Sequence, residues 1–272
     1  MKQKMNKYEN FLREAELSES TISSYMRAVK DFNNFLGERN LEKQVVLEYK
    51  KHLQQKGYQS STMNLYIIAI NRFVRYCGEK QAVIKTVKCQ RQKSLDNIIN
   101  EEDYKKLLQY ALQAGQDKYY LIMKTMAVTG IRVSELRCIT KNALEKGYTR
   151  VNNKGKIREI YLPESLTEQL TEYCRKEGIC EGAIFRGNSK QPISRNAVWK
   201  MLRKLADQAG VDQKKVFPHS FRHFFALSYM KKFSNIFELA DILGHADLET
   251  TRIYTTASIE QKRQRLEQLD IM

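Results

Sequence analysis

The stretch YTRVNNKGKIREIYLP, residues 148–163, carries the clearest β pattern of this sequence. Short runs of β-favouring residues flank Asn153-Lys154-Gly155-Lys156, a polar centre with a glycine that is typical of a hairpin turn. The chain has only 12 glycines and 3 prolines, fewer than turn-rich sandwiches and barrels usually contain. The sequence therefore predicts a mostly α protein with a small β-hairpin.

Helical patterns surround this hairpin in the second half of the chain. They predict helices over residues 117–128, 133–139, 164–177, 194–209, 220–232 and 235–243. Another helix is expected to open at Asn100, whose side chain can cap it. Glu101, Glu102 and Asp103 follow at the positive end of that helix dipole.

The N-terminal part of the chain reads as a separate helical bundle. Ile22, Tyr25, Val29, Phe32 and Leu36 recur at steps of 3 and 4 residues, which places them on one face of an amphipathic helix. Two similar segments follow, with the inward residues Val46, Tyr49 and Leu53, and then Met63, Tyr66, Ile67, Ile70, Phe73, Val74 and Cys77.

A domain boundary is predicted where this periodicity stops and the sequence becomes basic and polar. We expect a helical domain over residues 1–88, a linker over 89–96 and a second domain over 97–272. The two domains of this division are compatible with the chain length of 272 residues.

The charge points to a polyanionic partner. The 47 Lys and Arg residues exceed the 31 Asp and Glu residues by 16, and the excess is +8 in residues 1–96 and +8 in residues 97–272. The positive electrostatic field of this excess charge attracts nucleic acid and would let both domains hold one polyanion from opposite sides. The alternative, a basic protein kept soluble by its charge, stays open on composition alone.

Cysteine usage and hydropathy exclude several classes of protein. The five cysteines form no CxxC pair and have no histidines at zinc-finger spacing, so neither a disulfide framework nor a structural zinc is expected. The chain has no signal-peptide pattern and no run near the roughly 18 apolar residues needed to span a bilayer. We expect a soluble cytoplasmic protein without a membrane partner.

Four short motifs carry the residues that could do chemistry. They are TGIRVSEL at 129–136, NKGK at 153–156, HSFRH at 219–223 and LGHADLETTRIYT at 243–255. Within them stand, in chain order and at separations of 22, 65, 3, 23 and 9 residues, Arg132, Lys154, His219, Arg222, His245 and Tyr254. Each residue alone would usually be structural or solvated, and only the whole set indicates a reactive site.

On these motifs the sequence resembles the tyrosine recombinases, also called the phage integrase family. The resemblance is dense over residues 97–260, and the size is similar to that of the simpler Xer-type members. A SAM-like core-binding domain before a catalytic domain is implied. One departure is Phe221, where the family usually has leucine, and this apolar exchange should alter only packing.

The resemblance implies a site-specific recombinase that integrates or exchanges DNA through a 3′-phosphotyrosine, with neither metal nor ATP. Double-stranded recombination sites are the implied partner. A monomer in free solution would form a tetramer on DNA in the prokaryotic nucleoid, and a role for accessory proteins stays open. The tail ASIEQKRQRLEQLD, residues 257–270, resembles the family's C-terminal helix that docks on a neighbouring protomer.

The chemistry of these residue types suits strand cleavage. At pH 7 only about one part in a thousand of a free tyrosine is ionised. Forming the reactive phenolate therefore costs roughly 4 kcal/mol. Arg132 and Arg222 can neutralise charge on the phosphate, and Lys154, as the family also implies, can protonate the leaving oxygen. We expect no cofactor, because two arginines can replace a metal and no acidic cluster stands beside them.

The histidines and Glu135 have supporting places in this scheme. His219 is expected to be the base or proton relay and His245 a donor to the phosphate, although these two roles could be exchanged. Glu135 is expected to orient a basic catalytic residue, while His223 either packs near the site or relays protons. The candidate DNA contacts, with solvated charge as the alternative, are Lys156, Arg195, Lys200, Arg203 and Lys204, and in the bundle Arg27, Arg72 and Arg75.

Two other functions compete with recombination. A type IB topoisomerase would use similar chemistry but relax supercoils without paired sites. A non-catalytic DNA-binding regulator could keep the same fold without the reaction. The intact set of six candidate residues favours an enzyme over the regulator.

Overall fold

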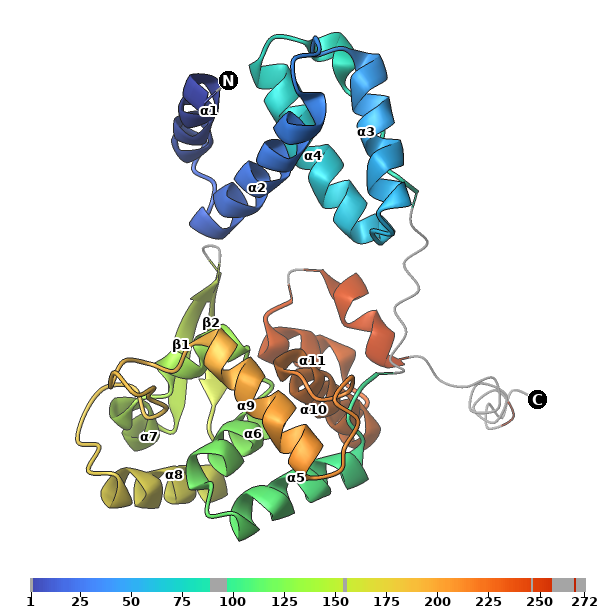
Figure 1. Cartoon of the computed structure of the whole chain (residues 1–272). Helices are drawn as coiled ribbons and strands as arrows, with labels where there is room; N and C mark the ends of the chain where they lie inside the picture. Colours follow the sequence, from blue (N-terminus) through green and yellow to red (C-terminus); the bar gives the residue numbers. More distant parts are fainter. Residues whose placement is uncertain (1, 89–96, 154–155, 246, 256–266, 268–272) are drawn as a thin grey trace. The chain divides into compact units, whose positions relative to one another are not determined.

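The computed structural model describes the chain except residues 1, 89–96, 154–155, 246, 256–266 and 268–272 (Figure 1). The described part is mostly helical and contains one two-stranded antiparallel sheet, which confirms the predicted fold class. Contacts within the chain define two compact units, Met1–Gln92 and Lys93–Met272. Among the described residues, no helix is both long and apolar enough to cross a lipid bilayer.

The first unit is a helical bundle. Its elements are α1 (Lys2–Glu14), α2 (Glu19–Leu36), α3 (Lys43–Gln55), α4 (Ser60–Tyr76) and the 3-10 turn η1 (Lys80–Ala82). Helix α4 packs against both α2 and α3. The predicted inward residues Phe32, Tyr49 and Ile70 are at most 1% exposed. Helix α1, which the periodicity did not single out, adds Tyr8 and Leu12 to a further cluster around Phe73.

The chain that follows α4 is fastened back onto the first unit by two asparagines. The Asn71 side chain donates to the Ile84 carbonyl at 2.8 Å and accepts from the Ile84 backbone N–H at 3.0 Å. Asn64 makes the same pair of bonds with Val87, at 2.9 and 2.7 Å. The chain therefore belongs to the bundle as far as Val87, and the predicted linker at 89–96 lies outside the described residues.

The second unit combines helices with the hairpin. Its elements are α5 (Glu101–Gln113), α6 (Asp117–Thr129), η2 (Val133–Cys138), α7 (Lys141–Lys146), β1 (Tyr148–Asn153), β2 (Lys156–Tyr161), α8 (Glu164–Lys176), α9 (Arg195–Gln208), α10 (Pro218–Phe233), α11 (Ile236–Leu243), η3 (Leu248–Thr250) and η4 (Arg252–Thr255). Helix α6 packs against α5, α8 and α10. Its Ile122, Met123 and Met126 are fully buried, as expected for a central helix.

Most local predictions in this unit are confirmed. Strands β1 and β2 pair from Tyr148–Tyr161 to Asn153–Lys156, which confirms the hairpin strands, and residues 154–155 of the predicted turn lie outside the described part. Asn100 caps α5, and its side chain accepts from the Asp103 backbone at 2.7 Å.

The predicted helix over 133–139 is instead the 3-10 helix η2. Arg132 is extended directly before it, and the Glu135 carboxylate accepts from the Arg132 backbone N–H at 2.9 Å. Backbone bonds to the third residue back, such as that from the Glu135 N–H to the Arg132 carbonyl at 2.8 Å, are those of a 3-10 helix.

We predict that Asn71→Ala destabilises the first unit by about 1–3 kcal/mol, because a buried N–H and a buried carbonyl of Ile84 lose their partner. Urea unfolding measures the loss. Asn34→Ala, an exposed position on α2, is the matched control and should change stability by less than about 0.5 kcal/mol. Equal losses in the two variants would contradict the fastening role.

Candidate active site

Arg132 is positioned by a turn that only glycine fits well. Helix α6 ends at Thr129, and Gly130 follows with a φ of +62°. A Cβ at Gly130 would lie 2.6 Å from Phe225 Cδ1 and 2.9 Å from Leu243 Cδ2, so a larger residue would both strain the backbone and clash. The chain leaves this turn with Arg132 extended.

Helix α10 supplies three candidate residues from its first turns. Pro218 occupies the first turn, a position for which its fixed φ is suited. Arg222 and His223 follow His219 by three and four residues, so both lie next to His219 on the helix surface. The His219 and His223 rings meet edge to face with centroids 4.6 Å apart. Phe221 is fully buried on the core side.

Arg222 is a buried guanidinium that joins three segments. Its Nη1 donates to the Gly130 carbonyl at 2.6 Å, and its Nη2 contacts the Leu243 carbonyl and His245 Nε2, the latter at 3.1 Å. The residue is only 1% exposed. Burial, together with the charges of Arg132 and Arg158, lowers the pKa of Arg222 to about 9, so it remains charged at neutral pH.

The partners of His245 define its protonation. Because Arg222 can only donate, His245 Nε2 accepts, and its Nδ1 then carries the proton that reaches Thr251 Oγ1 at 2.8 Å. Burial and the nearby Arg222 and Arg132 lower the pKa of His245 to about 4. The ring is therefore neutral at pH 7, with both nitrogens engaged.

Glu135 holds two arginines. Its Oε1 lies 3.1 Å from Arg132 Nη1, and its Oε2 lies 2.7 Å from Arg158 Nη2. The carboxylate is 8% exposed. This position suits the predicted role of Glu135 in orienting Arg132. Arg132 Nη2 also approaches the Gly244 carbonyl at 3.4 Å.

Arg158 was not singled out by the sequence analysis. Its side chain is 10% exposed, and its Nε and Nη1 are buried without a hydrogen-bond partner among the described residues. The sequence did contain a signal for this residue. Arg158 stands two residues before the buried Ile160 on β2, so both side chains lie on the inward face of the strand. Burial is the main cause that lowers the pKa of Arg158.

Tyr254 lies on η4 with its hydroxyl turned toward α10. The residue is 7% exposed and packs with Ala226, Leu239 and Leu243. Its Oη is 2.6 Å from His223 Nδ1. Burial raises the pKa of Tyr254 to about 12, although Arg222 acts in the opposite direction. The phenol is thus a weaker acid here than a free tyrosine.

One pocket of about 520 Å³ gathers the candidates of the second unit. Its lining is Asn97, Ile98, Arg132, Phe217, His219, Arg222, His223, His245, Thr250, Ile253 and Tyr254. Five of the six residues predicted to be catalytic therefore meet here, together with His223. The sixth, Lys154, lies outside the described residues. Among the described residues, no group of three or more His, Cys, Asp and Glu is arranged to hold a metal ion.

The predicted DNA contacts differ in exposure. Side chains at Arg27, Arg75, Arg195, Lys200 and Lys204 are exposed, and nothing is described of the side chain at Lys156. Two others make protein contacts that the sequence did not suggest. Arg203 donates to the Gln213 carbonyl at 2.9 Å and lies over the Trp199 ring, and the Arg72 guanidinium lies over the Phe11 ring.

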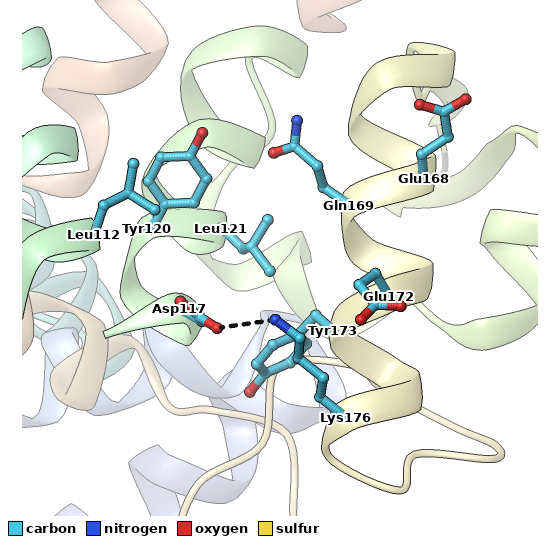
Figure 2. Close-up of a pocket in the computed structure, with 9 residues that line it drawn as sticks. All are labelled: Leu112, Asp117, Tyr120, Leu121, Glu168, Gln169, Glu172, Tyr173 and Lys176. Carbon is cyan, nitrogen blue, oxygen red and sulfur yellow. Dashed lines mark ion pairs between the residues drawn. The ribbon is translucent and has the colours of Figure 1, made fainter. Parts of the chain in front are cut away.

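A second pocket of about 480 Å³ has the opposite character. Figure 2 shows it between α6 and α8, where Asp117 and Lys176 form an ion pair at 3.9 Å. Glu168 and Glu172 also line it (Figure 2), and it shares no lining residue with the arginine-lined pocket. These carboxylates would repel a phosphate, so the pocket around Arg222 is the better anion site.

We predict that Gly244→Ala disrupts the arginine cluster. Gly244 has a φ of +61°, and an added Cβ would lie 2.6 Å from Arg158 Nε and closer still to its Cδ. Gly147→Ala is the matched control, because its φ is +73° and no heavy atom lies within 4 Å of an added Cβ. Urea unfolding should show about 1–3 kcal/mol more loss for Gly244→Ala. Equal losses would mean that Arg158 moves aside at no cost.

Comparison with known proteins identifies relatives of this chain. The sequence profile "Phage integrase family" matches residues 97–261, and "Phage integrase, N-terminal SAM-like domain" matches residues 5–81. The chain is 29% identical over 228 residues to tyrosine recombinase XerA of Pyrococcus furiosus, with 81% of this chain and 78% of the relative covered. It is 26% identical to tyrosine recombinase XerD of Staphylococcus aureus, with 92% of each chain covered.

A solved structure shows the same fold. The crystal structure of a lambda integrase tetramer bound to a Holliday junction superposes with a TM-score of 0.75 at 17% identity, and covers 93% of this chain and 76% of that one. The profile match alone spans more than half of the sequence. This chain belongs to the phage integrase family of tyrosine recombinases.

Proposed function

We propose that this protein is a site-specific DNA recombinase in which Tyr254 cleaves a strand and holds it as a 3′-phosphotyrosine. The convergence of Arg132, Arg222 and Tyr254 on one pocket carries this proposal. A nucleophile, two fixed cations and a cavity between them are the minimum that phosphoryl transfer to tyrosine requires.

The two arginines would stabilise the pentavalent phosphorus. As Tyr254 attacks, negative charge grows on the nonbridging oxygens, and planar guanidiniums can meet it with charge-assisted hydrogen bonds. Each such donor is commonly worth about 3 kcal/mol in the transition state. Arg222 is already fixed by backbone carbonyls and Arg132 by Glu135, so little reorganisation is needed when the phosphate arrives.

The bonds exchange in one balanced step. Tyr254 Oη forms a bond to phosphorus while the bond from phosphorus to the 5′ oxygen breaks, and the phenolic proton passes to a histidine. Lys154 gives a proton to the departing 5′ oxygen. Support for Lys154 comes from strand β2, which continues from that turn to Arg158 beside Glu135. One phosphodiester replaces another, so rejoining needs no ATP.

The partner would be double-stranded DNA carrying recombination sites. Both units are basic, and the related lambda integrase structure is described as a tetramer bound to a Holliday junction. We therefore propose a tetramer on paired sites, with the helical unit as a second DNA grip. The tail at 257–270 that would link protomers lies outside the described residues except for Glu267. With bacterial and archaeal relatives, the prokaryotic cytoplasm is the proposed location.

We predict a metal-independent covalent adduct. In EDTA, with a nicked DNA that carries the cognate site, a denaturing gel should show protein joined to DNA. Tyr254→Phe should abolish this adduct, while Tyr229→Phe, in the same apolar cluster, should retain it. Arg132→Ala should slow adduct formation about 100- to 1,000-fold and leave DNA affinity within about threefold, since one phosphate contact among many adds little to binding.

Three outcomes would contradict the proposal. Failure of the unaltered protein to form an adduct on its cognate site would favour a DNA-binding regulator. An undiminished adduct from Tyr254→Phe would place the nucleophile elsewhere. Relaxation of a supercoiled plasmid at equal rates with and without the site would favour a topoisomerase.

A further inference from the structure

Arg158 lies behind the pocket that holds Tyr254. Its side chain is 10% exposed, and it is not among the described residues that line this pocket. We infer that Arg158 is a positioning residue: it holds the Glu135 carboxylate and offsets its charge, so that the positive charge of Arg132 stays available to the phosphate. This inference rests on the proposed function and adds one residue to it.

The carboxylate of Glu135 is shared between two guanidiniums. Its Oε1 accepts from Arg132 Nη1 at 3.1 Å, and its Oε2 accepts from Arg158 Nη2 at 2.7 Å. The same Oε2 also accepts from the Arg132 backbone N–H at 2.9 Å. Each carboxylate oxygen therefore has its own donor. The bond from Arg158 fixes the rotation of the carboxylate and so places Oε1 beside the Arg132 guanidinium.

Without Arg158, Glu135 would neutralise the cation that it orients. Arg132 and Glu135 alone form a pair without net charge, which attracts an anion far less than an uncompensated guanidinium does. The three guanidiniums of Arg132, Arg158 and Arg222 and the one carboxylate of Glu135 leave a formal charge of +2. A phosphodiester carries one negative charge, and attack by a tyrosine oxygen that loses its proton adds a second in the transition state. The charge of the cluster thus matches the charge that develops.

The surroundings of Arg158 make its charge effective in the pocket. After burial and Arg132, the charge of Arg158 is the next cause that lowers the pKa of Arg222, which lines the pocket. Gly244 leaves room for the side chain, since an added Cβ there would lie 2.6 Å from Arg158 Nε. Arg158 Nε and Nη1 are buried without a hydrogen-bond partner among the described residues, so Glu135 is the group that holds its guanidinium.

A second route from Arg158 to the reaction would run through the hairpin. Arg158 lies on β2, the strand that follows Lys154, and removal of Arg158 would then act by displacing Lys154. The contacts favour the route through Arg132, because Glu135 bonds to both its side chain and its backbone. The two routes differ in the step that they affect, which is charge stabilisation for Arg132 and protonation of the leaving oxygen for Lys154.

The test measures single-turnover adduct formation on nicked cognate DNA with Arg158→Met, which keeps a long side chain without its charge. We expect a rate at least about 30-fold slower, with DNA affinity within about threefold of the unaltered protein, because the loss falls on the transition state. Arg158→Lys keeps the charge and should stay within about tenfold of the unaltered rate.

A substrate without phosphate charge separates this electrostatic role from a structural one. In a methylphosphonate, a methyl group replaces one nonbridging oxygen of the scissile phosphate, so the neutral group needs less positive charge around it. We expect the difference between Arg158→Met and the unaltered protein to shrink on this substrate to less than about fivefold, and the defect of Arg132→Ala to shrink as well. A variant with a merely distorted site would lose the same factor on both substrates.

Removal of the carboxylate tests the route through Glu135. In a Glu135→Gln background, Arg158→Met should cost less than about fivefold, because no carboxylate remains for Arg158 to offset. A DNA substrate with sulfur in place of the bridging 5′ oxygen has a leaving group that needs no protonation. It would rescue a displaced Lys154 and should not rescue Arg158→Met.

Arg150→Met is the matched control. Arg150 lies on the same hairpin and also pairs with a glutamate, Glu159 at 3.0 Å, but its side chain is 66% exposed. Its loss should change the rate by less than about threefold. If Arg158→Met loses its cooperative unfolding transition, Arg158→Gln, which keeps a donor for Glu135 without a charge, repeats the measurements.

Several results would overturn the assignment. A near-normal rate for Arg158→Met, or an equal loss in Arg150→Met, would deny Arg158 a special part. Equal losses on the phosphate and the methylphosphonate, in Arg158→Lys and Arg158→Met, or with and without the Glu135 carboxylate would deny the role of charge. Rescue by the sulfur substrate would transfer the effect to Lys154.

These results leave the recombinase proposal intact, because the unaltered protein would still form the adduct on its cognate DNA. Absence of that adduct in the unaltered protein would instead reject the proposed function itself.

Discussion

The guanidinium of Arg222 is the interaction on which the rest of the site depends. Burying a charge of this kind is costly unless it is hydrogen-bonded, and here two backbone carbonyls accept from it. Both carbonyls stand at helix C-termini: Gly130 caps α6, and Leu243 is the last residue of α11. The negative ends of two helix dipoles are thus directed at one cation. This arrangement fixes the ends of α6 and α11 against α10 before any DNA is present.

The surroundings of Arg222 contain more positive than negative charge, in a largely buried cluster. Arg132 and Arg158 lie nearby, and Glu135 is the carboxylate that pairs with both. Burial and, after it, the charge of Arg222 lower the pKa values of His219, His223 and His245, which favours their neutral forms. A neutral imidazole can accept a proton, whereas an imidazolium cannot. The cluster is therefore suited to hold an anion beside neutral imidazoles.

The sequence predicted the fold class, the hairpin and most helices because each depends on local periodicity or capping, as at Asn100. A helix was predicted over residues 133–139, but periodicity did not distinguish the 3-10 type that η2 has. The spacing of the motifs identified Arg132, Arg222 and Tyr254 as candidate catalytic residues. The contact between His223 and Tyr254 could not be predicted in this way, since 31 residues separate them and only the packing of η4 on α10 brings them together.

The central claim is that one chain holds nucleophile and cations together, and mixing two inactive variants tests it most directly. Tyr254→Phe lacks the proposed nucleophile, and Arg132→Ala lacks one of the proposed phosphate-binding cations. If the site is complete within each chain, an equal mixture of the two proteins on a cognate DNA forms no more covalent adduct than the variants do separately. If Tyr254 of one protomer instead attacked in the pocket of its neighbour, the mixture would regain adduct at a substantial fraction of the unaltered rate, and the account would be wrong.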